Sequence, residues 1–279
     1  TGGGEAKEYG GTGNKGASAN TLKKVNEFAA YALFQQKIFQ LLTATGGLRM
    51  EHSSVFGSEW VPMAGLSSRL SPYSDLRVSV SKGFRSPSVM ELYTYAPNPD
   101  LEPERMINYE VSWLQTFAGS NLSTELTAFM SEGDNLIQVT GVGQAAKRMN
   151  VGQFSNKGIE LAIRYQVSDA LSLTGNYSFL HSNRILLATP RHQANLTANY
   201  RYRIFNLNVS AQQINDLYVS VSELSTENYT VLNARLSAAV FKGSDVFVSG
   251  QNLLNQEYQI NNGYPMPGIS IHGGVKVKF

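Results

Sequence analysis

Residues 193–203 read QANLTANYRYR, and this stretch decides the fold class. Apolar or aromatic residues occupy every second position, at Ala194, Leu196, Ala198, Tyr200 and Tyr202. The positions between them hold Gln, Asn, Thr or Arg. A period of two is that of a β-strand, because successive side chains of a strand point to opposite faces of the sheet. The stretch predicts a strand with one apolar and one polar face.

The same alternation recurs along the chain, in residues 76–81, 107–113, 159–165, 171–179, 205–212 and 232–240. Two earlier segments, about 26–36 and 59–70, alternate poorly, and we assign them as strands from their spacing. The total is about thirteen strands, each near the roughly ten residues that a tilted strand needs to cross a bilayer. The pattern predicts an all-β, antiparallel fold.

Composition narrows the class of protein. Charged residues make up 16% of the 279 residues and the formal net charge is +2, without a basic run, so a nucleic-acid footprint is missing. No run of about 18 apolar residues occurs, which excludes a transmembrane helix. A mean hydropathy of -0.21 with 14 Tyr and 13 Phe fits the alternating strands of a membrane barrel. The absence of cysteine and the scattered positions of the four histidines predict no metal site and no cofactor.

The connections between the strands alternate in length. Short links fall at 37–38, 71–73, 118–120, 167–169, near 203, and at 242–243, whereas long ones fall at about 82–105, 132–148, 181–190, 215–227 and 255–268. Outer-membrane barrels have short periplasmic turns and long extracellular loops. This orientation makes residues 1–21, which are rich in glycine, an extracellular loop segment, and residues 22–279 the transmembrane strands with their turns and loops. The strand count is then odd, so we expect a longer parent protein.

Three motifs carry a family resemblance. The first is SKGFRSPSVMELY at 81–93 with NPDLEPE at 98–104, the second is NVG at 150–152 with KGIEL at 157–161, and the third is QNLLNQEY at 251–258 with GYPMPG at 263–268. In this order they resemble the barrel of TonB-dependent outer-membrane receptors of Gram-negative bacteria. The resemblance implies the C-terminal ~13 strands of a 22-stranded transmembrane β-barrel. It implies import of a scarce nutrient, such as an iron-siderophore, haem or cobalamin, with energy from the TonB complex.

The sequence departs from that family at its N-terminal side. It shows neither the N-terminal plug, nor the short N-terminal segment that meets the energy-coupling protein, nor the first strands of the barrel. We therefore expect the TonB complex to act through a part of the parent protein outside this sequence. The Pro, Gly and Asn-Pro-Asp positions of the motifs also have a plain role in turns, so we interpret the motifs as architectural.

Loop residues supply the candidate contacts to a small-molecule or metal-chelate ligand, and these are Tyr93, Tyr95, Arg105, Tyr218, Tyr258, Tyr264 and Met266. The last strand, residues 269–279, alternates and ends in an aromatic residue. It resembles the C-terminal signal that the barrel-assembly machinery recognises, carried here by Ile271, Val275, Val277 and Phe279. The expected partners are membrane lipid, this machinery, the TonB complex and the ligand.

Two other classes of protein remain open from the sequence. A passive porin-like barrel has an open lumen and no plug, and a soluble all-β binding or adhesion module buries its apolar face against a second sheet. Catalysis has no support, because Glu102 and Glu104 flank Pro103 without a partner base and Gly141-Val142-Gly143 is not followed by a helix.

Overall fold

A computed structural model of the chain describes residues 1–12, 22–94, 96–141, 143–220, 223–241 and 243–277. Among them, fourteen strands form one antiparallel sheet in the order β1-β2-β3-β4-β5-β6-β7-β10-β11-β12-β13-β14-β15-β18. Two small hairpins, β8–β9 and β16–β17, lie in the connections. The bounds are β1 (Gly2–Thr12), β2 (Leu22–Phe39), β3 (Leu42–Ser53), β4 (Gly57–Ser71), β5 (Ser74–Arg85), α1 (Val89–Tyr93), β6 (Glu104–Thr116), β7 (Leu122–Asp134), β8 (Ile137–Thr140), η2 (Gly143–Ala145), β9 (Lys147–Asn150), β10 (Phe154–Gln166), β11 (Leu171–Ser182), β12 (Pro190–Tyr202), β13 (Phe205–Ser220), β14 (Ser225–Phe241), β15 (Ser244–Gln251), β16 (Gln259–Asn261), β17 (Tyr264–Pro265) and β18 (Ser270–Val277).

The strands keep the predicted faces in register. Leu196 stands opposite Ala211 and Tyr200 opposite Leu207, so apolar residues meet apolar ones across β12 and β13. Residues of the polar face also stand opposite each other, and Asn208 Nδ2 donates to Asn199 Oδ1 at 2.7 Å. Cross-strand pairs of like polarity stabilise a sheet and fix its register. The alternation predicted for this part of the chain is confirmed.

The apolar face is the exposed one. Leu196 is 56% exposed and Trp113 45%, whereas Ser112, beside Trp113 on the opposite face of β6, is only 6% exposed. In a protein surrounded by water, large apolar side chains on this scale are covered by other parts of the chain. A strand whose apolar side chains face outward matches the lipid-facing side of a membrane barrel. No helix of the described residues has the length and apolar character needed to cross a membrane.

Strand β1 corrects the prediction for the first residues. The sequence predicts a loop for 1–21, but Gly2–Thr12 pairs with β2 from Gly2 opposite Ala32 to Thr12 opposite Leu22. The sheet therefore has one strand more than the about thirteen expected. Glycines contribute no side chain to an alternating pattern, which is why this strand gives no periodic signal. Gly3 also makes room for a ring, because a Cβ there would lie 2.6 Å from the hydroxyl oxygen of Tyr31. The rest of the predicted loop, 13–21, lies outside the described residues.

Other connections differ in their limits from those predicted. The first turn is at Gln40 and Leu41 and not at 37–38. Strands β13 and β14 run into the predicted loop 215–227, and the loops 132–148 and 255–268 contain the two small hairpins. The remaining short links at 71–73, 118–120 and 167–169 are confirmed, whereas Lys242 lies outside the described residues. In β13 the backbone pairing continues past the predicted limit into a stretch where Leu217 and Val219 are buried, so apolar residues no longer alternate with polar ones as on the lipid-facing part of the strand.

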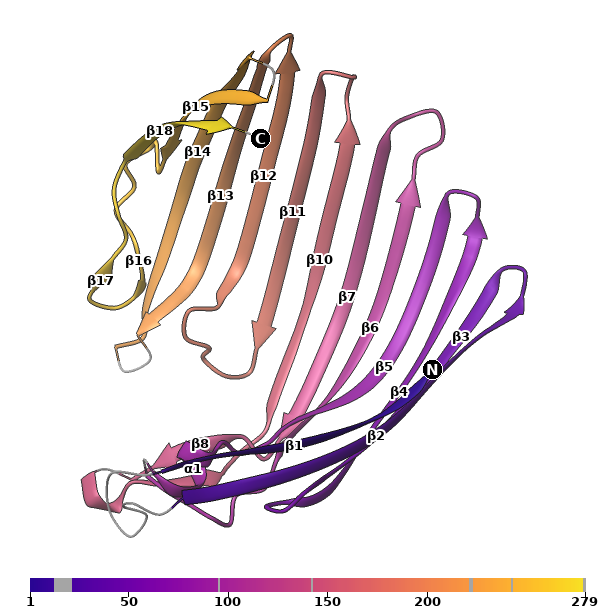
Figure 1. The fold of residues 1–279 in the computed structure, drawn as a ribbon, viewed down its shortest axis with the longest axis vertical. Coiled ribbons are helices and arrows are strands. Elements are labelled where there is room, and N and C mark those ends of the chain that lie inside the picture. The colour runs from indigo at the N-terminus through magenta and orange to yellow at the C-terminus, as the bar shows by residue number, and fades with distance from the viewer. Residues whose placement is uncertain (13–21, 95, 142, 221–222, 242, 278–279) are drawn as a thin grey trace. The chain divides into compact units, whose positions relative to one another are not determined.

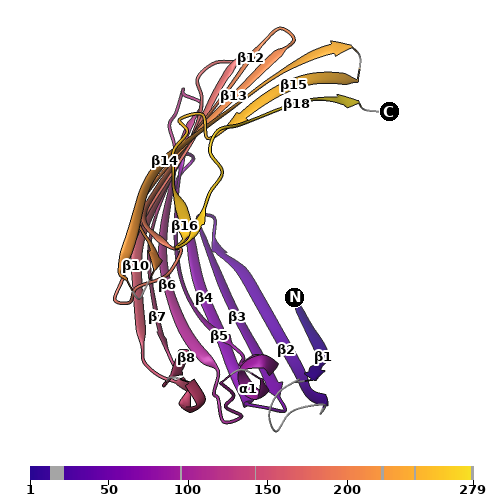
Figure 2. The ribbon, with the colours of Figure 1, turned by 90° about the vertical axis from the view of Figure 1, so that its left-hand side faces the viewer.

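The chain divides into two compact units. The first unit is Thr1–Leu70, Leu76–Val111 and Phe129–Asn156, and the second unit is Ser71–Asp75, Ser112–Ala128 and Lys157–Phe279. The first unit holds α1 and the β8–β9 hairpin, and Figure 1 shows both at the same ends of its strands. The second unit holds the β16–β17 hairpin (Figure 2), which lies beside β13, because the Asn262 N–H donates to the Val219 carbonyl at 3.0 Å.

Asn252 fixes the connection that leads into β18. It is buried, has a left-handed backbone (φ 49°), and its Nδ2 donates to the carbonyls of Gln256 (2.9 Å) and Pro267 (3.0 Å). Its Oδ1 accepts from the Gln256 N–H at 2.9 Å. Alanine at this position leaves these buried backbone groups unpaired, at a cost of about 1–3 kcal/mol. We expect Asn252→Ala to lower the denaturation midpoint of the full-length protein in detergent.

The matched control for this variant is Gln251→Ala, because Gln251 is the preceding residue and is exposed. A surface substitution of this kind changes the free energy of unfolding by no more than about 0.5 kcal/mol. Equal denaturation midpoints for the two variants would show that Asn252 does not hold the connection.

Candidate ligand-contact sites

The loop between β5 and β6 begins with a capped helix. The Ser88 hydroxyl accepts the N–H of Glu91 (3.3 Å), and the Glu91 carboxylate accepts the N–H of Ser88 (2.8 Å). This is a capping box, which satisfies two N–H groups that the first turn of a helix otherwise leaves without a partner. The helix α1 is short, but Leu92 is fully buried and anchors it. The loop therefore carries a fixed element of structure.

Glu91 is the electrostatic centre of this region. Its carboxylate is 2.9 Å from Arg85 Nη1 and 3.4 Å from Arg148 Nη1, and the residue is only 7% exposed. Arg85 also reaches Glu104, with Nε to Oε2 at 2.7 Å. Burial by itself raises the pKa of Glu91, but the hydrogen bonds from Arg85 and Ser88 outweigh it and leave the pKa below its usual value. Glu91 is therefore ionised in the folded protein at neutral pH.

A second loop, residues 135–153, is joined to the first by backbone and amide groups. Asn98 Nδ2 donates to the Arg148 carbonyl (2.8 Å), and the Arg148 N–H donates to the Ala96 carbonyl (2.9 Å). Asn150 accepts the N–H of Glu102 and donates to the Glu102 carbonyl, both at 2.8 Å. We call the joined loops, residues 86–103 without Tyr95 and 135–153 without Val142, the loop plate. The bonds between them make the loop plate one folded body.

Acidification tests the charge of Glu91. A carboxyl group whose pKa is lowered by folding stabilises the fold above its unfolded value of 4.5, and this contribution is lost as the pH falls through the lower folded value. We expect hydrogen exchange of the loop plate to be equally slow at pH about 7 and about 5, after correction for the intrinsic rate, and to accelerate below about 4. The control is the β11–β12 pair, which contains no carboxylate. Equal acceleration in both places would contradict the assignment.

Two predicted contacts of the first unit lie at the loop plate. Arg105 is in β6, and its guanidinium is engaged, with Nε 2.8 Å from Glu59 Oε1 and Nη1 3.3 Å from Glu102 Oε2. Glu59 is buried and also receives Lys82 Nζ at 3.0 Å. Tyr93 is the half-buried last residue of α1. Tyr95 lies outside the described residues. To contact a ligand, the Arg105 guanidinium would have to break its ion pair with Glu59.

In the second unit, three of the predicted contacts come together near the β16–β17 hairpin. Tyr258 stacks on Tyr229 with ring centroids 4.1 Å apart, and it packs on a buried apolar cluster formed by Ile214, Leu217, Val219, Tyr229 and Val231. The Met266 N–H donates to the Tyr258 carbonyl at 2.9 Å. Tyr264, in β17, is 75% exposed. Tyr258 thus anchors the hairpin, and Tyr264 is an exposed aromatic side chain of the hairpin.

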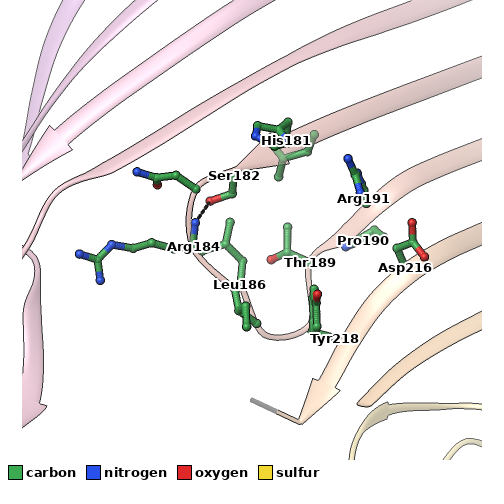
Figure 3. Close-up of a pocket in the computed structure, with 12 residues that line it drawn as sticks. His181, Ser182, Arg184, Leu186, Thr189, Pro190, Arg191, Asp216 and Tyr218 are labelled. Carbon is green, nitrogen blue, oxygen red and sulfur yellow. Dashed lines mark hydrogen bonds between the residues drawn. The ribbon is translucent and has the colours of Figure 1, made fainter. Parts of the chain in front are cut away.

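Tyr218 lines a pocket of about 220 Å³ under the loop between β11 and β12. Its wall is formed by the ends of β11 and β12, the loop itself and β13, with the residues Leu180, His181, Ser182, Asn183, Arg184, Ile185, Leu186, Thr189, Pro190, Arg191, Asp216 and Tyr218. In Figure 3 the guanidinium of Arg184 points away from the other labelled side chains, whereas Pro190, Arg191 and Asp216 lie together at the β12 side.

The predicted assembly signal lies on β18. Ile271, Val275 and Val277 are exposed, and they pair with Gly250, Val246 and Ser244 of β15. Phe279 lies outside the described residues. The role of these residues in assembly stays a prediction.

Several polar residues of these sites escape the sequence patterns. The Ser-x-x-Glu signature at Ser88 and Glu91 is a capping-box signal and could have located α1. Nothing local indicates that Arg148 meets Glu91, because 57 residues separate them. Asp216 and Arg191 carry no sequence signal for a shared pocket. In the described residues, no group of three or more His, Cys, Asp or Glu side chains is arranged to hold a metal ion.

Comparisons with known proteins agree on one family. The family model described as "TonB dependent receptor-like, beta-barrel" matches residues 3–253. The iron-regulated outer membrane virulence protein of Vibrio cholerae is 25% identical over 96% of this chain and 47% of its own length. The vitamin B12 transporter BtuB of Vibrio vulnificus is 26% identical over 88% of this chain and 41% of its own.

Solved structures share the fold. The siderophore receptor PirA from Pseudomonas aeruginosa superimposes with a TM-score of 0.77 at 17% identity, covering 92% of this chain and 47% of that one. The chain thus spans less than half the length of the relatives and of the solved structure.

Proposed function

This chain belongs to the family of TonB-dependent receptor-like β-barrels, and from that membership we propose that it forms the barrel wall and long loops with which a receptor captures a scarce nutrient for import. Its location is the bacterial outer membrane. Curated relatives are named as a ferrienterobactin receptor and a vitamin B12 transporter, so the substrate class we propose is an iron chelate or a cobalamin-like complex. The partner that supplies energy to the whole protein is the TonB complex.

One observation carries the proposal. The family model runs through a sheet whose outward-facing side chains are apolar, and the connections at one end of its strands carry the loop plate, the β16–β17 hairpin and the pocket of Tyr218. In outer-membrane barrels the long connections lie on the extracellular side. We propose that these three features face the outside of the cell, where ligand is met, and that lipid and the barrel-assembly machinery are the other partners.

Uptake by whole cells tests the function. Cells that produce the whole receptor are compared with cells that lack it for accumulation of ferric enterobactin and of cobalamin, each labelled, with and without an uncoupler of the proton gradient. We expect accumulation of one of the two, abolished by the uncoupler. Accumulation that persists with the uncoupler indicates a passive pore. Accumulation of neither complex rejects the proposed substrate class.

A further inference from the structure

The pocket under the β11–β12 connection is built from pinned backbone. The Arg184 N–H donates to Ser182 Oγ at 3.1 Å where the connection leaves β11. Near its other end the Ala188 N–H donates to the Tyr218 carbonyl at 2.9 Å, so the connection is tied to β13. Both ends of the connection are held, and an open-sided pocket of about 220 Å³ lies between it and β13.

Asp216 enters this cavity through an irregularity of β13. The pairing of β13 with β14 shifts between Ile214 and Leu217, and Asp216 within this bulge has a left-handed backbone with φ 54°. Its N–H is satisfied by Asn228 Oδ1 at 2.8 Å. Bulges redirect side chains at binding sites, and a left-handed conformation in a residue other than glycine costs free energy that the surrounding structure must offset. Asp216 lies in this bulge and lines the wall of the pocket.

Arg191 brings the opposite charge to the same wall. It is the second residue of β12, and its guanidinium carbon lies 5.8 Å from the ring centroid of Phe179. Within the described ranges, neither the Arg191 guanidinium nor the Asp216 carboxylate has a hydrogen-bonding or ion-pairing side chain. Both residues line the pocket, together with the Tyr218 and Thr189 side chains (Figure 3). One small cavity therefore presents an open anion and an open cation.

This combination selects a class of ligand. A simple anion that approaches Arg191 also meets the negative charge of Asp216, and a simple cation that approaches Asp216 meets Arg191. A group with both charges satisfies both side chains at once, through charge-assisted hydrogen bonds. The volume admits the end of a larger ligand and not a whole drug-sized molecule, for which pockets of roughly 300–1,000 Å³ are usual.

We propose that this pocket binds a zwitterionic group that carries an ammonium and a carboxylate, such as the α-amino-acid end of a ligand. Asp216 accepts from the ammonium, and Arg191 donates to the carboxylate. The proposal rests on the proposed function, which places this pocket on the extracellular side of the barrel, where a ligand that carries the group reaches it.

The test uses the whole receptor in detergent, with L-alanine as the probe. Acetate carries only the negative charge of L-alanine, and methylammonium carries only the positive charge. Binding of all three compounds is followed by saturation-transfer NMR. We expect L-alanine to bind at least about tenfold more tightly than either half, which corresponds to about 1.4 kcal/mol. Equal affinity for acetate and L-alanine, or no binding of L-alanine, overturns the proposal.

Variants separate the pocket from the rest of the surface. Arg191→Gln and Asp216→Asn each remove one charge and are expected to weaken L-alanine binding about tenfold or more. The matched controls Arg201→Gln, at the other end of β12, and Asp169→Asn, in a short turn, are expected to bind as the unchanged protein does. Heat-modifiable migration in gels verifies that each barrel is folded. Unchanged binding by both pocket variants overturns the proposal.

Uptake measured in the same strains tells the two proposals apart. If uptake depends on the receptor but L-alanine does not bind, the proposal of a zwitterion pocket is rejected and the proposed function stands. L-alanine binding that depends on Arg191 and Asp216, without uptake of either labelled complex, removes the proposed substrate class and supports the pocket.

Discussion

Glu91→Ala is expected to destabilise the loop plate by about 3–5 kcal/mol, the usual cost of removing one partner of a buried ion pair. The carboxylate receives Arg85, Arg148 and the N–H of Ser88, so its loss removes one ion-pair partner from each guanidinium and the Glu91 half of the capping box, while Arg85 keeps Glu104. Because the two loops share their hydrogen bonds, we expect both to open together. The change is confined to the loop plate, since the sheet does not depend on these contacts.

Hydrogen exchange of the whole receptor in detergent measures this effect. The amide of Asn98, which bonds to the Glu91 carbonyl, and the amide of Arg148, which bonds to Ala96, are the reporters. Their protection is expected to fall by about two to three orders of magnitude, since each 1.4 kcal/mol is about tenfold. Glu102→Gln is the control, because Glu102 is exposed and an exposed ion pair contributes only about 0–1 kcal/mol. Loss of protection at Asn98 alone would contradict the view of the loop plate as one body.

Leu196→Arg is expected to destabilise the barrel by about 2–4 kcal/mol, the cost of an arginine on the lipid face at the middle of the membrane. Leu196 lies midway along β12 with its side chain on the exposed apolar face. The measurement is the denaturation midpoint of the whole receptor in lipid vesicles, together with the fraction that migrates as a folded barrel on gels.

Thr197→Arg is the matched control, since the next residue of the strand points to the polar face and stands opposite Thr174 and Ser210. We expect its denaturation midpoint to stay near that of the unchanged protein. If Thr197→Arg were the more damaging of the two, the assignment of the faces would be reversed, and the lipid would lie on the other side of this sheet.

The strands of the second unit were predictable because the face of the sheet that contacts lipid must be apolar. Every second residue of β11, β12 and β13 must be apolar. The sequence therefore shows which side chains lie on each face of the sheet, and this sets the pairing of Leu196 with Ala211. Strand β1 has the same backbone geometry, but its glycines have no side chain and so show no alternation in the sequence. The end of β13, up to Ser220, packs into a buried cluster through Leu217 and Val219, so its residues do not follow the alternation that lipid imposes.

The candidate sites were harder to predict, for a physical reason. Tyr258 and Met266 lie together because they are close in sequence, on the two sides of one hairpin, and their contact with a ligand stays a prediction. Glu91 meets Arg148 only after several strands have been placed between them, so neither residue reveals its partner. Arg105 shows the reverse case, since a cation next to a long loop indicates ligand contact, whereas in the fold it pairs with Glu59. Whether Arg105 also contacts ligand stays a prediction.

The bonds within the loop plate limit how this surface can diversify between strains. Asn98 holds the backbone of Arg148, and Asn150 holds the backbone of Glu102, so a change at either asparagine disturbs the neighbouring loop as well as its own. The hairpin closes between Thr140 and Lys147, and these contacts lie outside its tip. Substitutions that leave the loop plate folded should therefore collect between those two residues. Residues of the two loops that hydrogen-bond to each other should change only together.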